Sequence, residues 1–233
     1  MKIAYKVIFI HKVYMHITVK NLLDIKNNIQ VYLNDSGIKS NPKIIAVSKT
    51  FKMDKILPLV DYGHIDFGEN KVQESLEKWP EIKKKNPKIK LHLIGKLQTN
   101  KVKFAVQIFD YIHSVDSEKL ARKIADEQHK INKKIKIFLQ VNIGDENQKS
   151  GINKNEVGQL VSFGKEIGLN VIGLMCIPPV NSDPEGYFVE MNELNKDLGL
   201  AELSMGMSSD YLIAAKNFST YVRVGSSIFG QRS

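Results

Sequence analysis

The amino-acid sequence predicts a single-domain (β/α)8 barrel of the TIM type with an N-terminal helix. Eight short, apolar, β-rich segments alternate with segments of helical periodicity, which is the pattern of parallel βαβ units. The 233 residues are 42% hydrophobic, enough for one α/β domain with a sizeable core. Polar residues follow most of the apolar segments, at the positions where such a barrel carries its functional face. A doubly wound open sheet is the alternative topology.

Each strand candidate is a short apolar run, and the runs are separated by helical spacing. The first helix is expected over residues 19–33, before the turn signal Asn34-Asp-Ser-Gly37. The strand candidates are residues 44–48, 64–68, 90–95, 111–115, 136–143, 171–177, 202–207 and 221–225. Helices are expected near 53–62 and 70–78, from 99–100 toward 106, from 117 to about 129, from 153, from 184, and from 209 to about 217. The final helix is almost missing, and the N-terminal helix is expected to cover that gap.

Side chains that can cap a helix support several of these helix starts. An oxygen of Ser, Thr, Asn or Asp can accept from the unpaired amides of the first turn. Thr99-Asn100 and Ser117 are such candidates, and Asn153 with Glu156 has the spacing of a capping box. Asp183-Pro184 combines a cap with a proline at the first helical position, where its missing N–H is no loss.

Composition narrows the possible partners. The net charge is +9, but the densest lysine cluster, residues 81–90, has no interleaved aromatic residues and is interpreted as a solvated helix end and loop. Nucleic acid is therefore not an expected partner. The longest uncharged apolar run near the start is Val7 to Ile10, too short for a membrane span. Residues 1–14 are interpreted as a dispensable extension and residues 15–233 as the barrel. The single cysteine, Cys176, is expected in the core and fits a reducing compartment, the cytoplasm.

The run Ile44-Ile-Ala-Val-Ser-Lys-Thr50 is the stretch around which the predicted site is built. It is typical of a buried parallel strand and places Lys49 where that strand leaves the core. A partly desolvated lysine there can lose its proton near neutral pH and form a Schiff base with a carbonyl. The alternative is a lysine that only solvates a strand end.

The last strand end suggests an anion site. Barrels often bind phosphate with the loops after strands seven and eight. The run Gly225-Ser-Ser-Ile-Phe-Gly230 supplies a glycine, two hydroxyls and unpaired amides there, and Ser208 could add a hydroxyl from strand seven. A small polar turn is the alternative. With Lys49, these residues indicate an aldehyde that also carries a phosphate, either pyridoxal 5'-phosphate (PLP) or a sugar phosphate held by a Schiff-base aldolase.

Arg223 separates these two ligands. Arginine occurs only at three positions in this lysine-rich chain, and Arg223 lies between two valines of the last strand candidate. A buried guanidinium needs a specific acceptor, and a pyridine nitrogen is one. Donation to that nitrogen keeps it unprotonated and weakens the ring as an electron sink. An aldolase has no need of this arrangement, so PLP is favoured.

Several longer motifs follow one another in order over residues 19–231. They are Ala46-Val-Ser-Lys-Thr50, Phe67-Gly-Glu-Asn-Lys-Val-Gln-Glu74, His92-Leu-Ile-Gly95, Leu97-Gln-Thr-Asn-Lys101, Val141-Asn-Ile-Gly-Asp-Glu146, Lys149-Ser-Gly151, Gly173-Leu-Met-Cys-Ile-Pro178, Leu203-Ser-Met-Gly-Met-Ser208 and Val222-Arg-Val-Gly-Ser-Ser-Ile-Phe-Gly230. Together they resemble the pyridoxal phosphate homeostasis proteins, single-domain barrels related to the N-terminal domain of alanine racemase. The family usually has threonine where Ser226 stands, and this substitution keeps the hydroxyl.

The resemblance implies PLP as the cofactor and assigns residues to it. These are Lys49 as the covalent Schiff-base lysine, Arg223 at the pyridine nitrogen, Asn70 beside the ring, and Ser208, Gly225 and Ser226 at the phosphate. No catalytic residue and no metal is expected. Lys149, in the Lys-Ser-Gly motif, could serve a second cofactor site, although a surface lysine is the preferred interpretation.

The expected function is PLP homeostasis in the cytoplasm by a monomer that buffers PLP or delivers it to apo-enzymes, without established turnover. Racemisation needs a base on each face of the cofactor. Alanine racemase takes its second base from a tyrosine in another domain, which this chain is expected to be too short to contain. A weak amino-acid racemase, or another PLP-dependent enzyme, is the alternative.

Overall fold

Eight parallel strands close into a barrel in this computed structural model, which describes residues 15–146 and 150–231. The strands are paired in chain order, and β8 pairs with β1 to close the ring. Their bounds are β1 (Lys43–Val47), β2 (Asp66–Glu69), β3 (Lys90–Leu93), β4 (Tyr111–Val115), β5 (Lys136–Val141), β6 (Asn170–Cys176), β7 (Glu202–Ser204) and β8 (Tyr221–Val224). The predicted barrel is therefore confirmed, and the open sheet is wrong.

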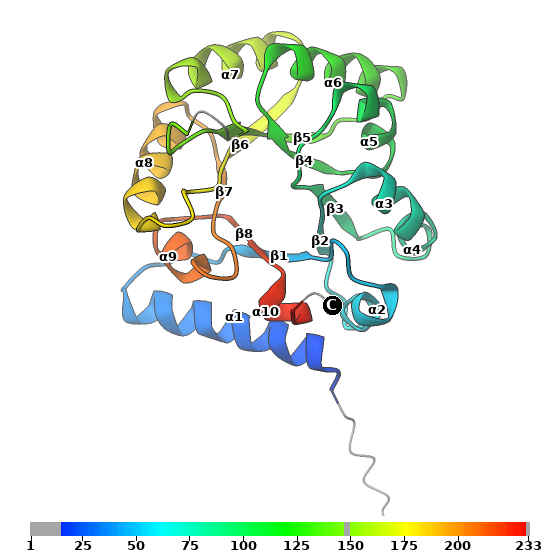
Figure 1. Ribbon diagram of the computed structural model, residues 1–233, viewed down its shortest axis with the longest axis vertical. Coiled ribbons are helices and arrows are strands. Elements are labelled where there is room, and N and C mark those ends of the chain that lie inside the picture. The colour runs from blue at the N-terminus through cyan, green and yellow to red at the C-terminus, as the bar shows by residue number, and fades with distance from the viewer. Residues whose placement is uncertain (1–14, 147–149, 232–233) are drawn as a thin grey trace, which may run out of the picture.

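Helices surround the ring of strands, as Figure 1 shows in a view along the barrel. The helices of the first half are α1 (Ile17–Asp35), α2 (Met53–Asp61), α3 (Val72–Lys78), α4 (Pro80–Lys85), α5 (Val102–Ile108) and α6 (Glu118–Lys130). Those of the second half are α7 (Val157–Glu166), α8 (Pro184–Asp197), α9 (Tyr211–Lys216) and α10 (Ser226–Phe229). Two 3-10 turns, η1 (Thr99–Lys101) and η2 (Lys154–Glu156), lead into α5 and α7.

The N-terminal helix covers the gap left by the short last helix. α1 packs against α9, α10 and α2 and lies alongside them in Figure 1. The side-chain amide of Asn21 on α1 donates to the carbonyl of Ile228 on α10 over 2.9 Å. The barrel thus has a complete outer layer although α10 is only one turn long, as the sequence predicted.

The structure confirms most of the predicted helix starts and differs from the prediction in two places. Ser117, Asn153 and Asp183 accept from backbone amides at the starts of α6, η2 and α8. Thr99-Asn100 does not cap a helix: these residues are themselves in η1, and no side-chain oxygen caps it. Residues 81–90 do form a helix end and a loop, but the helix is a separate one, α4, that starts at Pro80. Proline suits this first position because the missing N–H has no intrahelical partner.

The strand wall has two buried faces. Successive side chains of a strand point to opposite sides, so on β1 Ile44 and Ala46 join the core beneath the helices while Ile45 and Val47 join a separate cluster inside the barrel. Cys176 lies in the outer core, as predicted. Among the described residues, no helix is long and apolar enough to cross a membrane. Residues 1–14 and Lys149 lie outside the described residues.

Candidate functional site

A cavity of about 480 Å³ lies at the carboxyl ends of the strands, within the size range of small-molecule sites. The structure brings all the predicted binding residues to this one cavity. Its lining consists of Val47, Lys49, Phe51, Asn70, Ile94, Ile177, Met207, Ser208, Ser209, Arg223, Gly225, Ser226 and Gly230. The carboxyl ends of β1, β2, β7 and β8 therefore converge, as predicted from the polar residues that follow these strands.

Lys49 lies in a turn that two carboxylates hold in place. The Ser48 hydroxyl donates to Glu69 Oε1 over 2.8 Å, and the amide of Thr50 donates to Glu74 Oε1 over 2.6 Å. Thr50 has a φ of +66°, a left-handed conformation that is strained for a β-branched residue. The two carboxylates, on β2 and α3, thus fix the backbone on both sides of the lysine. Lys49 itself is half-buried and lines the cavity.

Glu69 is the centre of a buried polar cluster behind this turn. Its Oε1 also accepts from Lys78 Nζ over 3.1 Å and from Trp79 Nε1 over 3.0 Å. Lys78 in turn donates to the carbonyl of Ser48 over 2.9 Å. Burial raises the pKa of the Glu69 carboxyl, and the positive charge of Lys78 opposes that rise. The cluster joins the end of β1 to β2 and α3, so it positions the turn that carries Lys49.

Arg223 is 4% exposed and reaches the cavity from inside the barrel. Its Nη1 donates to the carbonyl and the hydroxyl of Ser204, both over 2.7 Å, and its Nη2 donates to the carbonyl of Cys176 over 2.9 Å. Burial lowers the pKa of the guanidinium. Within the described residues no carboxylate lies at ion-pair distance from it. A guanidinium has five N–H donors, so these bonds leave N–H groups for a further acceptor.

Asn70 presents a polar atom to the same cavity. Its Oδ1 is buried and has no hydrogen-bond partner among the described residues. A buried acceptor without a partner is unfavourable and needs an explanation, which a ligand in the cavity would supply. Gly95, at the end of β3, allows the close approach that this arrangement needs, because a Cβ there would overlap the Asn70 carbonyl oxygen.

The loop after β8 forms the opposite side of the cavity. The amide of Gly225 donates to the Ser208 hydroxyl over 3.2 Å, which ties this loop to the loop after β7. Ile228 and Phe229 donate to the Gly225 carbonyl, so the bonds of α10 begin only there. The preceding amides are among the first-turn donors that a helix leaves unpaired. The exposed hydroxyl of Ser226 lies beside them.

Comparisons with known proteins agree with this geometry. The family model for the N-terminal domain of alanine racemase matches residues 21–233. A pyridoxal phosphate homeostasis protein of Pasteurella multocida is 36% identical over 91% of this chain and 97% of its own length. The corresponding protein of Escherichia coli K12 is 32% identical over 91% of this chain and 95% of its own. This chain belongs to the pyridoxal phosphate homeostasis protein family.

Solved structures show the same fold. A structure of PipY from Synechococcus elongatus PCC7942 with PLP bound has a TM-score of 0.80 and 30% identity, and covers 91% of this chain and 100% of PipY. An alanine racemase of Clostridium difficile 630 has a TM-score of 0.71 at 15% identity, and this chain covers 56% of it. At this identity the likeness to the solved racemase shows a shared fold.

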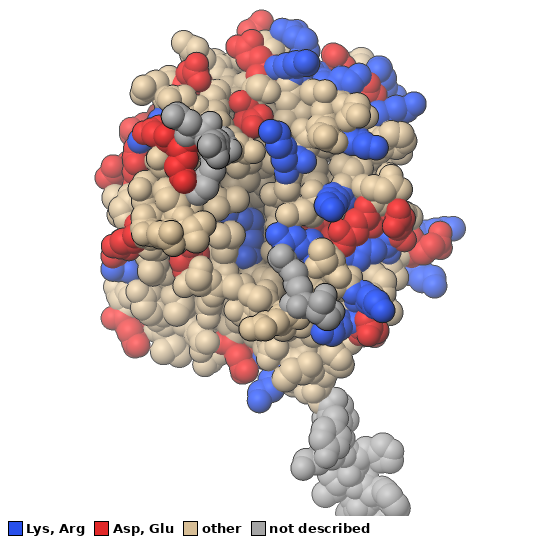
Figure 2. All heavy atoms as spheres, in the orientation of Figure 1, with Lys and Arg blue, Asp and Glu red and all other residues tan. Residues whose placement is uncertain are grey.

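The cavity combines apolar walls with basic side chains, which suits an anionic ligand that also has an apolar part. Apolar contacts come from Val47, Ile94 and Ile177, and Phe51 stacks on Phe229 with ring centroids 5.0 Å apart. Figure 2 shows a hollow near the middle of this face with basic side chains in it, whereas the acidic side chains lie farther out. Apolar walls with a few convergent polar groups are typical of cofactor sites.

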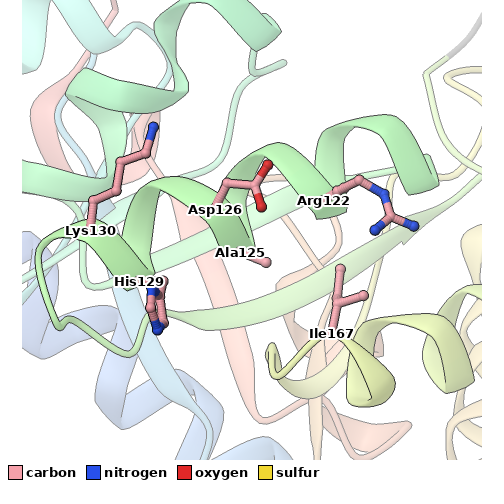
Figure 3. Close-up of a pocket in the computed structure, with 6 residues that line it drawn as sticks. All are labelled: Arg122, Ala125, Asp126, His129, Lys130 and Ile167. Carbon is pink, nitrogen blue, oxygen red and sulfur yellow. The ribbon is translucent and has the colours of Figure 1, made fainter.

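A second hollow lies outside the barrel, between α6 and the end of α7 (Figure 3). Its lining mixes Arg122, Asp126, His129 and Lys130 with apolar atoms of Ile167. The basic side chains of Arg122 and Lys130 point away from each other, so they do not converge on a common ligand. The described residues also contain no group of His, Cys, Asp or Glu placed to hold a metal ion.

Two sets of residues near the site escaped the sequence analysis. Glu69 and Trp79 position the Lys49 turn, and nothing in their local sequence shows that they meet. His92 and His113 lie inside the barrel, fully buried, and connect to Ser204 behind Arg223. Period-two alternation in β3 and β4 could have found this pair, because His92 stands between Leu91 and Leu93 of the outer core and His113 follows Ile112.

Proposed function

We propose that this homeostasis protein binds PLP in the cavity, with Lys49 joined to the aldehyde as a Schiff base. The observation that carries the proposal is the convergence of Lys49, Arg223 and the Gly225–Ser226 loop on one cavity. Bound PLP supplies an aldehyde carbon for an amine and a ring that withdraws electrons from what is attached to it. Lys49 supplies the amine, and the loops after β7 and β8 face the phosphate.

The donor set of the cavity fits each part of PLP. Arg223 has N–H groups left for the pyridine nitrogen, which offers a single lone pair in the ring plane. Asn70 offers a buried oxygen without a partner among the described residues, beside the place of the ring. Ser208, Ser226 and the amides at the start of α10 form a neutral, donor-rich cradle for the phosphate. These roles are proposals that rest on the position of each residue.

We further propose that the protein carries the cofactor without turning over a substrate. Among the described residues that line the cavity, Lys49 and Arg223 are the ionisable ones. A guanidinium stays protonated, so it does not serve as a base, and its donation to the ring nitrogen weakens the ring as an electron sink. Lys49 alone would serve one face of the cofactor, whereas racemisation needs a base on each face.

Delivery of PLP to apo-enzymes in the cytoplasm is the activity we propose for the loaded protein, acting as a monomer. Ser226 is exposed and lines the cavity, so we propose that a partner approaches the bound phosphate at this residue. The buried, unpaired Cys176 suits a reducing compartment. We propose residues 15–233 as the PLP-binding unit, so a chain that starts at Met15 should bind PLP equally well. Transfer to an apo-enzyme should then outpace PLP release into free solution.

The visible spectrum and a reduced adduct test the binding proposal. Purified protein should gain a visible absorption band on addition of PLP, and borohydride reduction followed by peptide mass spectrometry should place a pyridoxyl group on Lys49. Lys49→Ala should lose both signals. Lys52→Ala is the matched control, because this exposed lysine lies three residues further on and should leave both signals intact. A pyridoxyl group on another lysine of the wild-type protein would overturn the assignment.

A further inference from the structure

A continuous chain of hydrogen bonds crosses the inside of the barrel and ends at Arg223. Asp66 Oδ1 lies 3.0 Å from His92 Nε2, and His92 Nδ1 lies 3.0 Å from His113 Nε2. His113 Nδ1 lies 2.9 Å from the hydroxyl of Ser204, which lies 2.7 Å from Arg223 Nη1. The side chains come from β2, β3, β4, β7 and β8. All of them are buried, so the chain runs through a space that strands enclose on every side.

The charges at the two ends determine the direction of every proton. Arg223 only donates, so the Ser204 oxygen accepts from it and the serine proton is left for His113. A carboxylate only accepts, so His92 carries its proton on Nε2 toward Asp66. A neutral imidazole has one donor and one acceptor nitrogen, so His113 then donates from Nε2 to His92 Nδ1. Both ends therefore give the same order, with every donor pointing from the guanidinium toward the carboxylate.

Burial and ring packing keep the two histidines in this state. Burial lowers the pKa of His92, and it lowers the pKa of His113 well below the usual value, so both rings are neutral near pH 7. His92 stacks on Tyr111 with ring centroids 4.1 Å apart, and His113 stacks on Phe138 at 4.2 Å. The stacked rings cannot turn over without displacing these neighbours.

The hydrogen-bond chain links Arg223 to a carboxylate, which its immediate surroundings lack among the described residues. Its other acceptors are two backbone carbonyls, and none of the described carboxylates lies at ion-pair distance. A serine hydroxyl can rotate, but one whose proton is engaged by His113 keeps a lone pair directed at the guanidinium. Bonds in such a chain polarise one another in a low dielectric. At the negative end, the side chain of Asp66 is 12% exposed and borders a hollow at the amino end of the barrel beside Lys43 and His64.

We propose that His92 and His113 are positioning residues for Arg223. They fix the Ser204 hydroxyl as an acceptor, hold the guanidinium in the plane in which it meets a ring nitrogen, and couple it to a carboxylate at the opposite end of the barrel. The claim that Arg223 is held for a ring nitrogen of a cofactor rests on the proposed function. The proton order along the chain does not, because it follows from the side chains alone.

Nitrogen-15 NMR of the protein without PLP tests the proton order. Both histidine rings should show a protonated Nε2 and an unprotonated Nδ1 at pH 7, and each should take up its second proton at a lower pH than an exposed histidine does. Protonation of Nδ1 on either ring near pH 7 would overturn the proposal. Ser204→Ala should leave His92 unchanged and alter the Nδ1 signal of His113, since that atom loses its donor.

PLP titration of serine variants tests the positioning role. Ser204→Ala should weaken PLP binding about tenfold and shift the absorption maximum of the bound cofactor, because Arg223 loses a buried acceptor. Ser204→Thr keeps a hydroxyl on the strand and should restore both properties. Ser75→Ala is the matched control, since Ser75 is equally buried but donates to the carbonyl of Lys71 on the outer layer. His113→Phe keeps the stacked ring and should reproduce the Ser204→Ala spectrum if it folds.

The outcomes separate this inference from the proposed function. If wild-type protein forms no adduct on Lys49, the proposed function fails while the NMR result still decides the proton order. If the adduct forms but Ser204→Ala and Ser75→Ala give the same PLP affinity and the same absorption maximum, the positioning role is wrong. A shifted maximum in Ser204→Ala that Ser204→Thr reverses supports it.

Discussion

The two faces of the strand wall are built on opposite principles. The outer face packs against the helices through large apolar side chains such as Trp79, Phe67 and Leu91, all fully buried. The inner face combines a small apolar cluster with two buried histidines and Arg223. On β3 the contrast occurs within consecutive residues, because Leu91 faces out and His92 faces in. The same short strands thus carry an apolar core on one side and polar side chains on the other.

This difference separates stability from binding. Apolar burial is non-directional, so the outer core tolerates modest shape changes and provides most of the folding free energy. A buried polar chain contributes little net stability, but it becomes strongly unfavourable when one member is left unpaired. Substitutions on the outer face should therefore change the free energy of unfolding, and substitutions on the inner face should change the site.

The largest effect on stability is expected at Trp79 on the outer face. Trp79→Ala should lower the free energy of unfolding by about 3–5 kcal/mol, because it leaves a cavity in the core and removes a donor from Glu69. Urea denaturation measures this loss. Phe104→Ala, at an exposed aromatic residue, is the control and should change little. An unfolding free energy of Trp79→Ala as high as that of Phe104→Ala would contradict the assignment of the folding free energy to the outer core.

Acid should destabilise the protein through its buried histidines. Burial lowers the pKa of His64 from 6.5 to about 4, and the pKa values of His92 and His113 are lowered in the same direction. Between these values the unfolded chain binds a proton that the folded chain does not, so stability is complete above pH 6.5 and falls as the pH drops toward 4. His64 alone accounts for about 3 kcal/mol over that interval.

Denaturation at a series of pH values checks this loss. His64→Gln should flatten the acid limb of the profile, whereas His129→Gln, at an exposed position on α6, controls for the substitution itself. A stability that stays constant from pH 7 to pH 4.5 would mean that the buried histidines take up protons at the same pH in the folded protein as in the unfolded chain.

The sequence predicted the ring of strands better than it predicted which side chains lie on the inner and outer face of that ring. Strand length and alternation with helices suffice for a closed barrel, because parallel strands require crossover helices. The sequence does not show which side of each strand faces the barrel interior, because the side chains on both sides are buried and mostly apolar. Tyr111 and His113 face inward and Ile112 faces outward only because closure of the ring decides it. The polar chain was missed for that reason.

The sequence predicted which residues gather at the candidate site where position alone decides. Lys49 and Ser208 follow strands whose carboxyl ends share one face, and Arg223 was singled out as a cation between two valines of the last strand. The support for Lys49 was not predicted, because Glu69 meets Trp79 and Lys78 only after α3 packs beside β2. Contacts between elements carry no local sequence signal, so their energetics appear only in the folded structure.

A substitution at the mouth of the barrel, where both faces end, should have a smaller effect, on ligand affinity, and this effect should depend on the phosphate of the ligand. Ser208→Ala removes the acceptor of the Gly225 amide and a hydroxyl from the proposed phosphate cradle. PLP affinity should fall about fivefold, corresponding to about 1 kcal/mol for one hydrogen bond. Pyridoxal, which lacks the phosphate, should bind the variant and the wild-type protein equally. Equal losses of affinity for PLP and pyridoxal would show that Ser208 stabilises the loop and does not bind the phosphate.

The smallest effect is expected on substrate chemistry. Alanine added to PLP-loaded protein in deuterated water should exchange its α-proton no faster than it does with free PLP. Lys49 is the one base among the described residues of the cavity, and in the proposed arrangement Arg223 donates to the ring nitrogen. Racemisation would require a second base and a ring that accepts electrons readily. Rapid exchange that is lost in Lys49→Ala would instead make this barrel a racemase, and the polar inner face would then serve catalysis as well as binding.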